Sequence, residues 1–143
     1  MITAIAAVLI VILIDQKAKA YARENFTTRQ EQGFLTFYLV KNPGAFRGFL
    51  KNKPKLLLGL QTFGTVFVTL LTILSALRGK DKVLTVGLAL ISGGSIGNMI
   101  DRITEGEVTD FVAIKWTKNL YYNLADFAIF LGALIALVRS DKM

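Results

Sequence analysis

The sequence contains no cysteine and no histidine among its 143 residues. Without cysteine there is no disulfide and no thiolate nucleophile, and without histidine there is no Ser-His-Asp triad. The two absences together also remove the usual ligands of zinc. An enzyme built from this chain must therefore use Asp, Glu, Lys, Ser, Thr or Tyr. We expect neither a metal nor a cofactor.

Charge is also scarce over most of the chain. Four stretches are long, apolar and almost free of charged residues: Met1–Ile14, Leu56–Leu77, Val83–Ile100 and Leu120–Val138. The last contains one charged residue, Asp126, and the first reaches spanning length if its helix continues to Arg23. A hydrocarbon core of about 30 Å is crossed by roughly 20 helical residues. The sequence therefore predicts a single domain over residues 1–143, an all-α integral membrane protein with four transmembrane helices.

The charges that are present are mostly basic, with 17 Lys and Arg against 10 Asp and Glu. They concentrate in residues 15–55 and in the short segment 78–82. Four membrane spans and the lack of a basic tail argue against a nucleic-acid partner, so contact with anionic lipid headgroups is the simpler interpretation. Positive-inside counting places residues 15–55 in the cytoplasm and both termini outside.

Two longer polar segments, near residues 24–55 and 101–119, separate the predicted spans and share one side of the membrane. In the first, the run GFLTFYLVKN followed by Pro and Gly predicts a strand and then a turn. In the second, Val108, Asp110 and Val112 alternate with other residues and suit a short extended stretch. The fold prediction therefore includes a small β-containing segment between the first two helices.

Polar residues recur near this side at helical spacing. Asp15 and Lys19 are one turn apart, which by itself is often only an ion pair at a helix end. Asn98 and Asp101 are three residues apart with Arg102 beside them, and capping with a salt bridge is the plain alternative.

The same region contains a pattern that we do not interpret as catalytic. Gly93–Gly97 matches G-x-S-x-G, but that motif needs a strand–turn–helix context and a basic partner. Ser95 is therefore not expected to be a nucleophile. Gly93 and Gly97 instead have the spacing that allows two membrane helices to approach closely.

Asp126 is the residue whose position most needs explanation, because a charged side chain inside a bilayer costs about 2.5–3.5 kcal/mol on insertion scales. Asp110 lies sixteen residues upstream and is a candidate neighbour. Two close carboxylates share one proton, as aspartic proteolysis requires. The ionised member activates water, and the protonated member polarises the scissile carbonyl and later protonates the leaving amine.

Two other classes of protein remain open at this point. A small four-helix transporter that exchanges protons for cations would also use a lone acid within a helix, so it needs Asp126 and not Asp110. A non-enzymatic membrane scaffold needs neither acid.

Five segments of the chain, in order, match motifs of one family: Asp15–Lys19 (D-x-x-x-K), Asn42–Phe46 (N-x-G-A-A-F), Gly93–Arg102 (G-G-x-x-G-N-x-x-D-R), Val108–Phe111 (V-x-D-F) and Asn123–Asp126 (F-N-x-A-D). In these segments the chain resembles the lipoprotein signal peptidases (signal peptidase II), which are bacterial intramembrane aspartyl proteases. It departs from the pattern in having one Ala in the second motif and Tyr122 in place of Phe.

The resemblance implies that Asp110 and Asp126 are the catalytic pair. It implies a set of substrate-binding residues: Asp15, Lys19, Asn42, Gly44, Asn98, Arg102 and Asn123. It assigns Asp101 to ordering the end of the third span rather than to chemistry. The aromatic residues and glycines around Phe46, Phe49 and Leu50 favour a lid over the site.

By the same resemblance the substrate is a diacylglyceryl-modified prolipoprotein, cut just before its lipidated cysteine. The expected partners are this substrate and membrane lipid, with globomycin-type inhibitors, and the expected state is a monomer. The expected location is the bacterial plasma (inner) membrane, multi-pass, with both termini cytoplasmic and the active site and β-containing segment extracytoplasmic. This orientation conflicts with the charge count, and we follow the resemblance.

Overall fold

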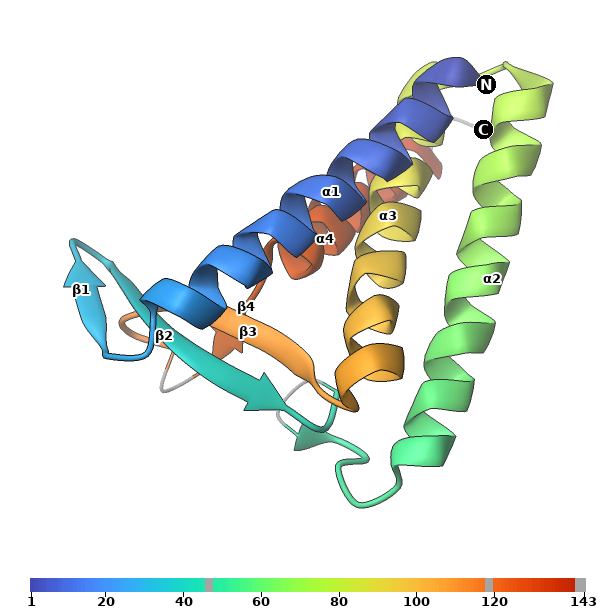
Figure 1. Cartoon of the computed structure of the whole chain (residues 1–143). Helices are drawn as coiled ribbons and strands as arrows, with labels where there is room; N and C mark the ends of the chain where they lie inside the picture. Colours follow the sequence, from blue (N-terminus) through green and yellow to red (C-terminus); the bar gives the residue numbers. More distant parts are fainter. Residues whose placement is uncertain (46–47, 118–119, 141–143) are drawn as a thin grey trace.

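Four helices and one small sheet make up the computed structural model, which describes residues 1–45, 48–117 and 120–140 (Figure 1). In chain order the elements are α1 (Ile2–Asn25), β1 (Gln30–Gln32), β2 (Leu35–Asn42), α2 (Pro54–Arg78), α3 (Lys82–Glu105), β3 (Val108–Ile114), β4 (Tyr121–Tyr122) and α4 (Leu124–Ser140). Helix α3 is central and packs against each of the other three helices. Both termini and the α2–α3 turn lie at one end of the molecule, and the sheet lies at the other (Figure 1).

The sheet is built from both polar segments. The strand expected before Pro43 is β2 and the extended stretch expected at Val108–Val112 is β3, so the β-containing segment is larger than the one predicted between the first two helices. Its four strands are antiparallel in the order β1-β2-β3-β4, so the segment between α3 and α4 supplies half of them. The ladder between β2 and β3 is irregular between Phe37 and Val40. At this bulge the N–H of Leu39 donates to the carbonyl oxygen of Phe26 at the end of α1, 2.8 Å away. The bulge therefore ties the sheet to the first helix.

The start of the fourth helix differs from the prediction. Residues 120–123 were expected to be helical, but Tyr122 pairs with Val112 in the sheet and α4 begins at Leu124. Asp126 therefore lies in the first turn of α4 rather than about 9 Å below the helix start, at roughly 1.5 Å per residue. Aromatic residues fit a half-buried strand well, and here pairing with β3 outweighs continuation of the helix.

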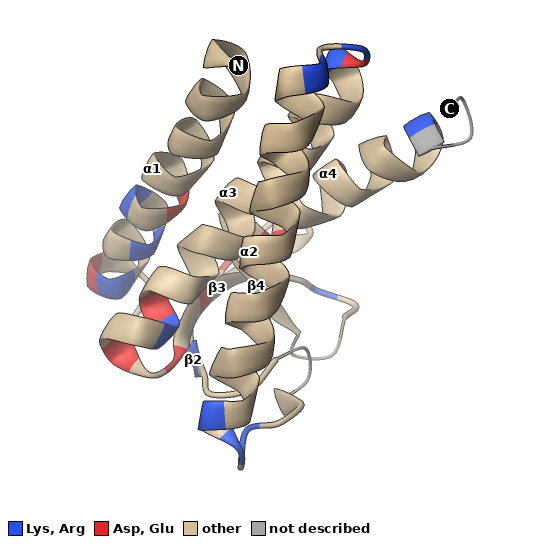
Figure 2. Ribbon diagram, turned by 90° about the vertical axis from the view of Figure 1, so that its right-hand side faces the viewer, with Lys and Arg blue, Asp and Glu red and all other residues tan. Residues whose placement is uncertain are grey.

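The distribution of polar and apolar side chains is the reverse of that in a water-soluble protein. The largest fully buried side chains are all polar: Lys19, Asn123, Thr36, Thr109, Asp15, Asp101 and Ser92. Large apolar side chains are instead exposed, including Phe63 and Phe130, which are 73% and 70% accessible. Charged residues gather toward the ends, while the middle of α2 carries none (Figure 2). Such a surface is suited to lipid rather than to water.

Two of the helices, α2 and α3, are long and apolar enough to cross a bilayer. Helix α4 has 17 residues, fewer than the roughly 20 needed for a perpendicular crossing. The second half of α1 carries charged residues from Asp15 onward. Length and composition of the helices therefore support two of the four expected spans.

Glycines set how closely the helices pack. A Cβ on Gly93 would lie 2.8 Å from the Cβ of Val11, so the expected close approach at this glycine is confirmed, with α1 as the neighbour. A Cβ on Gly132 of α4 would lie 2.4 Å from the carbonyl oxygen of Gly87 in α3. Because that neighbour is backbone, no side-chain rearrangement can relieve the clash.

We expect Gly132→Ala to destabilise the protein by about 1–3 kcal/mol, because α4 must move away from α3. Gly64→Ala is the matched control, since a Cβ on Gly64 would have no neighbour within 4 Å and Ala favours helix. The measurement is thermal unfolding of both variants in the same detergent. Equal melting temperatures for Gly132→Ala and the wild type would contradict the close contact.

Candidate active site

Asp110 of β3 and Asp126 of α4 are held by one residue between them, Asn123. The Asn123 side-chain Nδ2 donates to Oδ1 of Asp110 at 2.8 Å, and its backbone N–H donates to Oδ2 of Asp126 at 3.2 Å. In return, the backbone N–H of Asp126 donates to Oδ1 of Asn123 at 2.9 Å. These reciprocal bonds form a capping box at the start of α4. The cap that begins the helix therefore also brings the two acids together.

Each acid receives a second amide from another part of the chain. Asn42, at the end of β2, donates its Nδ2 to Oδ2 of Asp110 at 3.0 Å. Asn98, on α3, donates its Nδ2 to Oδ1 of Asp126 at 2.9 Å. Hydrogen bonds from neutral amides orient a carboxylate without adding charge. The two acids are therefore fixed in similar ways by donors from different elements.

Lys19 sets the orientation of Asn98. Its ammonium donates to the Asn98 amide oxygen at 2.9 Å, and since Lys has no acceptor, the amide nitrogen must face Asp126. The same ammonium forms ion pairs with Asp15 at 2.8 Å and Asp101 at 3.3 Å, and all three charged side chains are buried.

Asp15 has a further role at the start of α4. Its Oδ1 accepts a hydrogen bond from the backbone N–H of Ala125 at 2.9 Å, which satisfies one of the free donors at that helix terminus. Asp15 and Lys19 are fully buried among these partners. They support the site from behind and present no surface to a ligand in this structure.

Asp101 also stabilises the site, through hydrogen bonds with Thr109 and Gln16, two residues that the sequence did not single out. Oδ2 of Asp101 accepts from the backbone N–H of Thr109 at 2.9 Å, which fixes the chain next to Asp110. Nε2 of Gln16 donates to Oδ1 of Asp101 and to the carbonyl oxygen of Gly97, both at 3.1 Å. Gln16 lies at an unspecified position of the D-x-x-x-K motif, between Asp15 and Lys19. The motif therefore gave no reason to select it. The capping-box spacing of Asn123 and Asp126, by contrast, was readable in the sequence.

Arg102 holds the loop that follows β2. Its guanidinium donates to the carbonyl oxygens of Pro43 and Gly44. The loop is tight here, since a Cβ on Gly44 would lie 2.5 Å from the backbone of Gly48. Gly44 thus shapes the loop through its backbone. The predicted lid involves Phe46, which lies outside the described residues.

The environment of Asp110 favours a bound proton. Burial, and after it the neighbouring charge of Asp126, raise its pKa to about 7, against the opposing effect of the Asn42 and Asn123 amides. An interacting pair of this kind loses its protons in steps that belong to the pair. Near neutral pH the two acids can therefore hold one proton between them. In the part of the chain that the structure describes, no group of three or more carboxylates is arranged to hold a metal ion.

Comparison with known proteins gives a consistent result. The sequence model of a family described as signal peptidase (SPase) II matches residues 7–141. The chain is 34% identical over 138 residues to the lipoprotein signal peptidase of Syntrophus aciditrophicus, covering 90% of this chain and 86% of that protein. It is 38% identical over 135 residues to the lipoprotein signal peptidase of Moorella thermoacetica, covering 89% and 85%.

Two solved structures, each described as a bacterial membrane enzyme, share the fold. One superimposes with a TM-score of 0.84 at 23% identity and covers 99% of this chain and 89% of its own. The other has a TM-score of 0.78 at 24% identity and covers 96% and 92%. The arrangement of four helices with a small sheet is therefore that of known membrane enzymes.

We expect Lys19→Met to destabilise the protein by about 3–5 kcal/mol, because it leaves the buried Asp15 and Asp101 without their cation. Lys17→Met is the matched control on the same helix, since Lys17 is exposed, and it should change stability by less than about 0.5 kcal/mol. Chemical or thermal unfolding in detergent measures both. A Lys19→Met variant as stable as Lys17→Met would show that the ammonium is not needed.

Proposed function

This chain belongs to the signal peptidase II family and removes signal peptides from prolipoproteins, and on that premise we propose that Asp110 and Asp126 are its catalytic pair. The observation that carries the proposal is the Asn123 bridge, which holds both carboxyl groups at the junction of β3 and α4. A protease without cysteine or histidine needs another way to activate water, and two acids sharing a proton provide it.

In the proposed reaction, water attacks the scissile carbonyl carbon and gives a proton to the ionised acid. The protonated acid donates its proton to the carbonyl oxygen, which yields a neutral tetrahedral diol. When the diol collapses and the C–N bond breaks, the acid that took the proton from water gives it to the departing amine nitrogen, and the other acid takes a proton from a diol hydroxyl, which restores the starting pair. The carboxyl groups are held in place through these transfers by the amides of Asn42, Asn98 and Asn123. The acids can still exchange protons, because these hydrogen bonds use only part of the acceptor capacity of each carboxyl group.

Arg102 and Gly44 are proposed to bind substrate through the loop after β2. The guanidinium links this loop to α3 beside the acids, so a peptide backbone laid along the loop would reach both carboxyl groups. Arg102 Nε is buried without a hydrogen-bond partner, which leaves one donor of the guanidinium unused. Asp15 and Lys19 take part indirectly, through Ala125 and Asn98.

The finer description of the substrate is part of the proposal. It is a prolipoprotein that carries a diacylglyceryl group, and the cut falls just before the modified cysteine. Such a substrate is amphiphilic, and the exposed apolar side chains of the helices suit acyl chains and an apolar signal segment. We further expect inhibition by globomycin-type compounds and function as a monomer.

We propose that all four helices span the bacterial plasma (inner) membrane, with both termini cytoplasmic and the acids near the extracytoplasmic surface. Part of the positive charge that the positive-inside count finds in residues 15–55 is held in ion pairs. Lys19, Arg23 and Lys41 in the 15–55 region are paired with acids, so they do not act as free positive charges. Arg78 and Lys80, at the end with the termini, have no acidic partner among the described residues.

We expect Asp110→Asn and Asp126→Asn each to lower the rate of prolipoprotein cleavage by about 10²–10⁴-fold or more, because each removes one proton carrier. Glu31→Gln, at an exposed acid of the sheet, is the control and should retain activity. The assay uses purified protein and a diacylglyceryl-modified peptide, with membrane insertion checked for each variant. Loss with only one of the two substitutions would show that the other acid is not a needed proton carrier, and full activity in both variants would overturn the catalytic pair.

The pKa of about 7 for Asp110 predicts a pH limit. Below that pH the pair keeps its shared proton, and above it both acids ionise, so kcat/KM should fall as pH rises through about 7, approaching tenfold per pH unit. The measurement is kcat/KM for the lipidated peptide between pH 5.5 and about 9, in detergent without titratable headgroups. A flat profile across this range would contradict a shared proton.

A further inference from the structure

A second feature of the molecule lies at the end opposite the acids. An apolar cleft of about 360 Å³ opens between α1 and α2, with α3 as its floor. Its lining residues are Met1, Ala4, Ile5, Val8, Leu9, Thr69, Thr72, Ile73, Ala76 and Ser92. Helices α1 and α2 each pack on α3 and hardly touch each other, so the cleft is open toward the lipid. Neither the two acids nor their amide partners line it.

The chemistry of the lining suits a hydrocarbon chain. The hydroxyl groups of Thr69 and Ser92 bond to each other at 2.8 Å, and that of Thr72 bonds to the carbonyl oxygen of Val68 at 2.8 Å. Two of the three hydroxyl groups that line the cleft therefore donate within the protein. The volume of the cleft corresponds to roughly a dozen methylene groups, if each occupies about the 30 Å³ of a water molecule in the liquid. A straight acyl chain has this size and chemistry.

Basic residues follow shortly after Ala76, the last α2 residue that lines the cleft. Arg78, Lys80 and Lys82 are exposed in and beside the α2–α3 turn, and the salt bridges of the described residues include none of them. The acid in this turn, Asp81, is already occupied by Arg139, whose Nε and Nη2 lie 2.8 and 2.7 Å from its Oδ2. A hydrogen bond from the N–H of Leu84 lowers the pKa of Asp81, and the Arg139 guanidinium lowers it further, so the acid stays ionised and paired.

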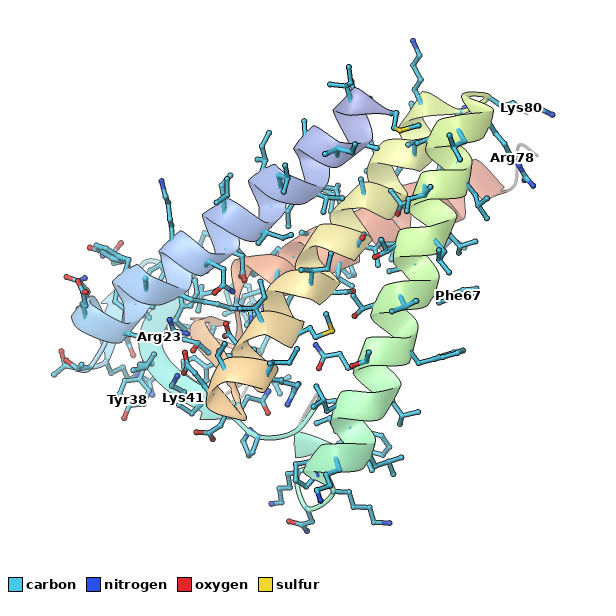
Figure 3. The ribbon with its side chains drawn as sticks, turned by 45° about the vertical axis from the view of Figure 1, so that its right-hand side comes forward. Arg23, Tyr38, Lys41, Phe67, Arg78 and Lys80 are labelled. Atoms are coloured by element: carbon cyan, nitrogen blue, oxygen red, sulfur yellow. The ribbon has the colours of Figure 1, made fainter. Side chains whose placement is uncertain are left out.

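Figure 3 shows how these charges lie relative to the rest of the molecule. Arg78 and Lys80 extend outward at the end where α1 begins, far from Arg23 and Lys41 beside the sheet. Met1 and Ala76 both line the cleft, so the start of α1 and the last turns of α2 border the same opening. Among the described residues the cations in and beside the α2–α3 turn have no ion-pair partner, so a lipid whose acyl chain lies in the cleft would find exposed positive charge for its phosphate at this end of the molecule.

We propose that this cleft is a binding site for one anionic phospholipid. One acyl chain fills the space between α1 and α2, and the headgroup phosphate lies against Arg78, Lys80 and Lys82. The site is separate from the peptidase chemistry. It rests on the proposed function in one respect, the placement of this end of the helix bundle in the membrane. The lipid would fill the gap that α1 and α2 leave between them and so hold α2 against the bundle.

The test is the number and type of lipids retained by the purified, delipidated full-length protein, measured by native mass spectrometry. Phosphatidylglycerol and phosphatidylcholine with identical acyl chains are added in parallel. We expect one phosphatidylglycerol per chain, bound about tenfold more tightly than phosphatidylcholine at low salt, with the preference shrinking as salt rises. Equal retention of the two lipids, or a preference unaffected by salt, would overturn the proposal without requiring any variant.

Matched variants separate the cleft from the basic residues. Ala76→Trp fills the cleft and should abolish retention of phosphatidylglycerol, whereas Leu77→Trp adds the same ring at the neighbouring exposed position and should not. Arg78→Gln/Lys80→Gln/Lys82→Gln should remove the preference for phosphatidylglycerol, whereas Lys51→Gln/Lys53→Gln/Lys55→Gln at the opposite end should preserve it. Equal binding by Ala76→Trp and Leu77→Trp, both folded by circular dichroism, would overturn the site.

Cleavage of the lipidated peptide, measured on the same variants, keeps the two proposals apart. None of these substitutions touches Asp110, Asp126 or their amide partners, so peptidase activity should remain. Loss of lipid selectivity with intact cleavage in the Arg78→Gln/Lys80→Gln/Lys82→Gln variant supports the lipid site. Selective lipid retention by an Asp110→Asn variant, which cannot cleave, would show that the site stands whether or not the catalytic proposal does.

Discussion

The ammonium group of Lys19 lies inside the helix bundle, away from solvent, between the carboxylates of Asp15 and Asp101. Removing a charge from water is expensive unless partners surround it, and here each partner has a second task. Asp15 accepts a hydrogen bond from the first turn of α4, and Asp101 accepts one from the start of β3. Asn98, whose amide is oriented by Lys19, donates a hydrogen bond to Asp126. One buried cation therefore fixes three elements around the acids.

This polar centre explains the unusual surface of the protein. In water, helices associate by burying apolar side chains, but in lipid that driving force is lost and packing and hydrogen bonds take over. The contacts between α2 and α3 follow this rule, since they include the pairs Thr69–Ser92 and Ser75–Thr85. Between α3 and α4, Gly87 and Gly132 let the backbones approach instead. Apolar residues are left facing outward, where acyl chains can cover them.

Several parts of the structure could be predicted from the sequence, each for a local reason. The uncharged runs predicted helices α2 and α3, because length and hydropathy are what a membrane-spanning helix requires. Both helices extend a few residues beyond these runs. The β2 strand and its turn followed from aromatic and β-branched residues before Pro43. The joining of β2 to β3 could not be predicted, since pairing between residues as far apart in sequence as Asn42 and Val108 depends on the helices that bring the strands together.

Sequence by itself determined the kind of chemistry available: a chain without cysteine or histidine has neither a thiolate nor an imidazole to activate water, and Asp110 and Asp126 are acids placed beside apolar helices. Tertiary structure decided the geometry. That the Asn123 side chain also binds Asp110, and that Asp15 and Lys19 are buried, depends on contacts between residues up to 110 positions apart. Such contacts leave no periodic signal, because hydropathy and spacing record only the neighbours of a residue along its own helix or strand.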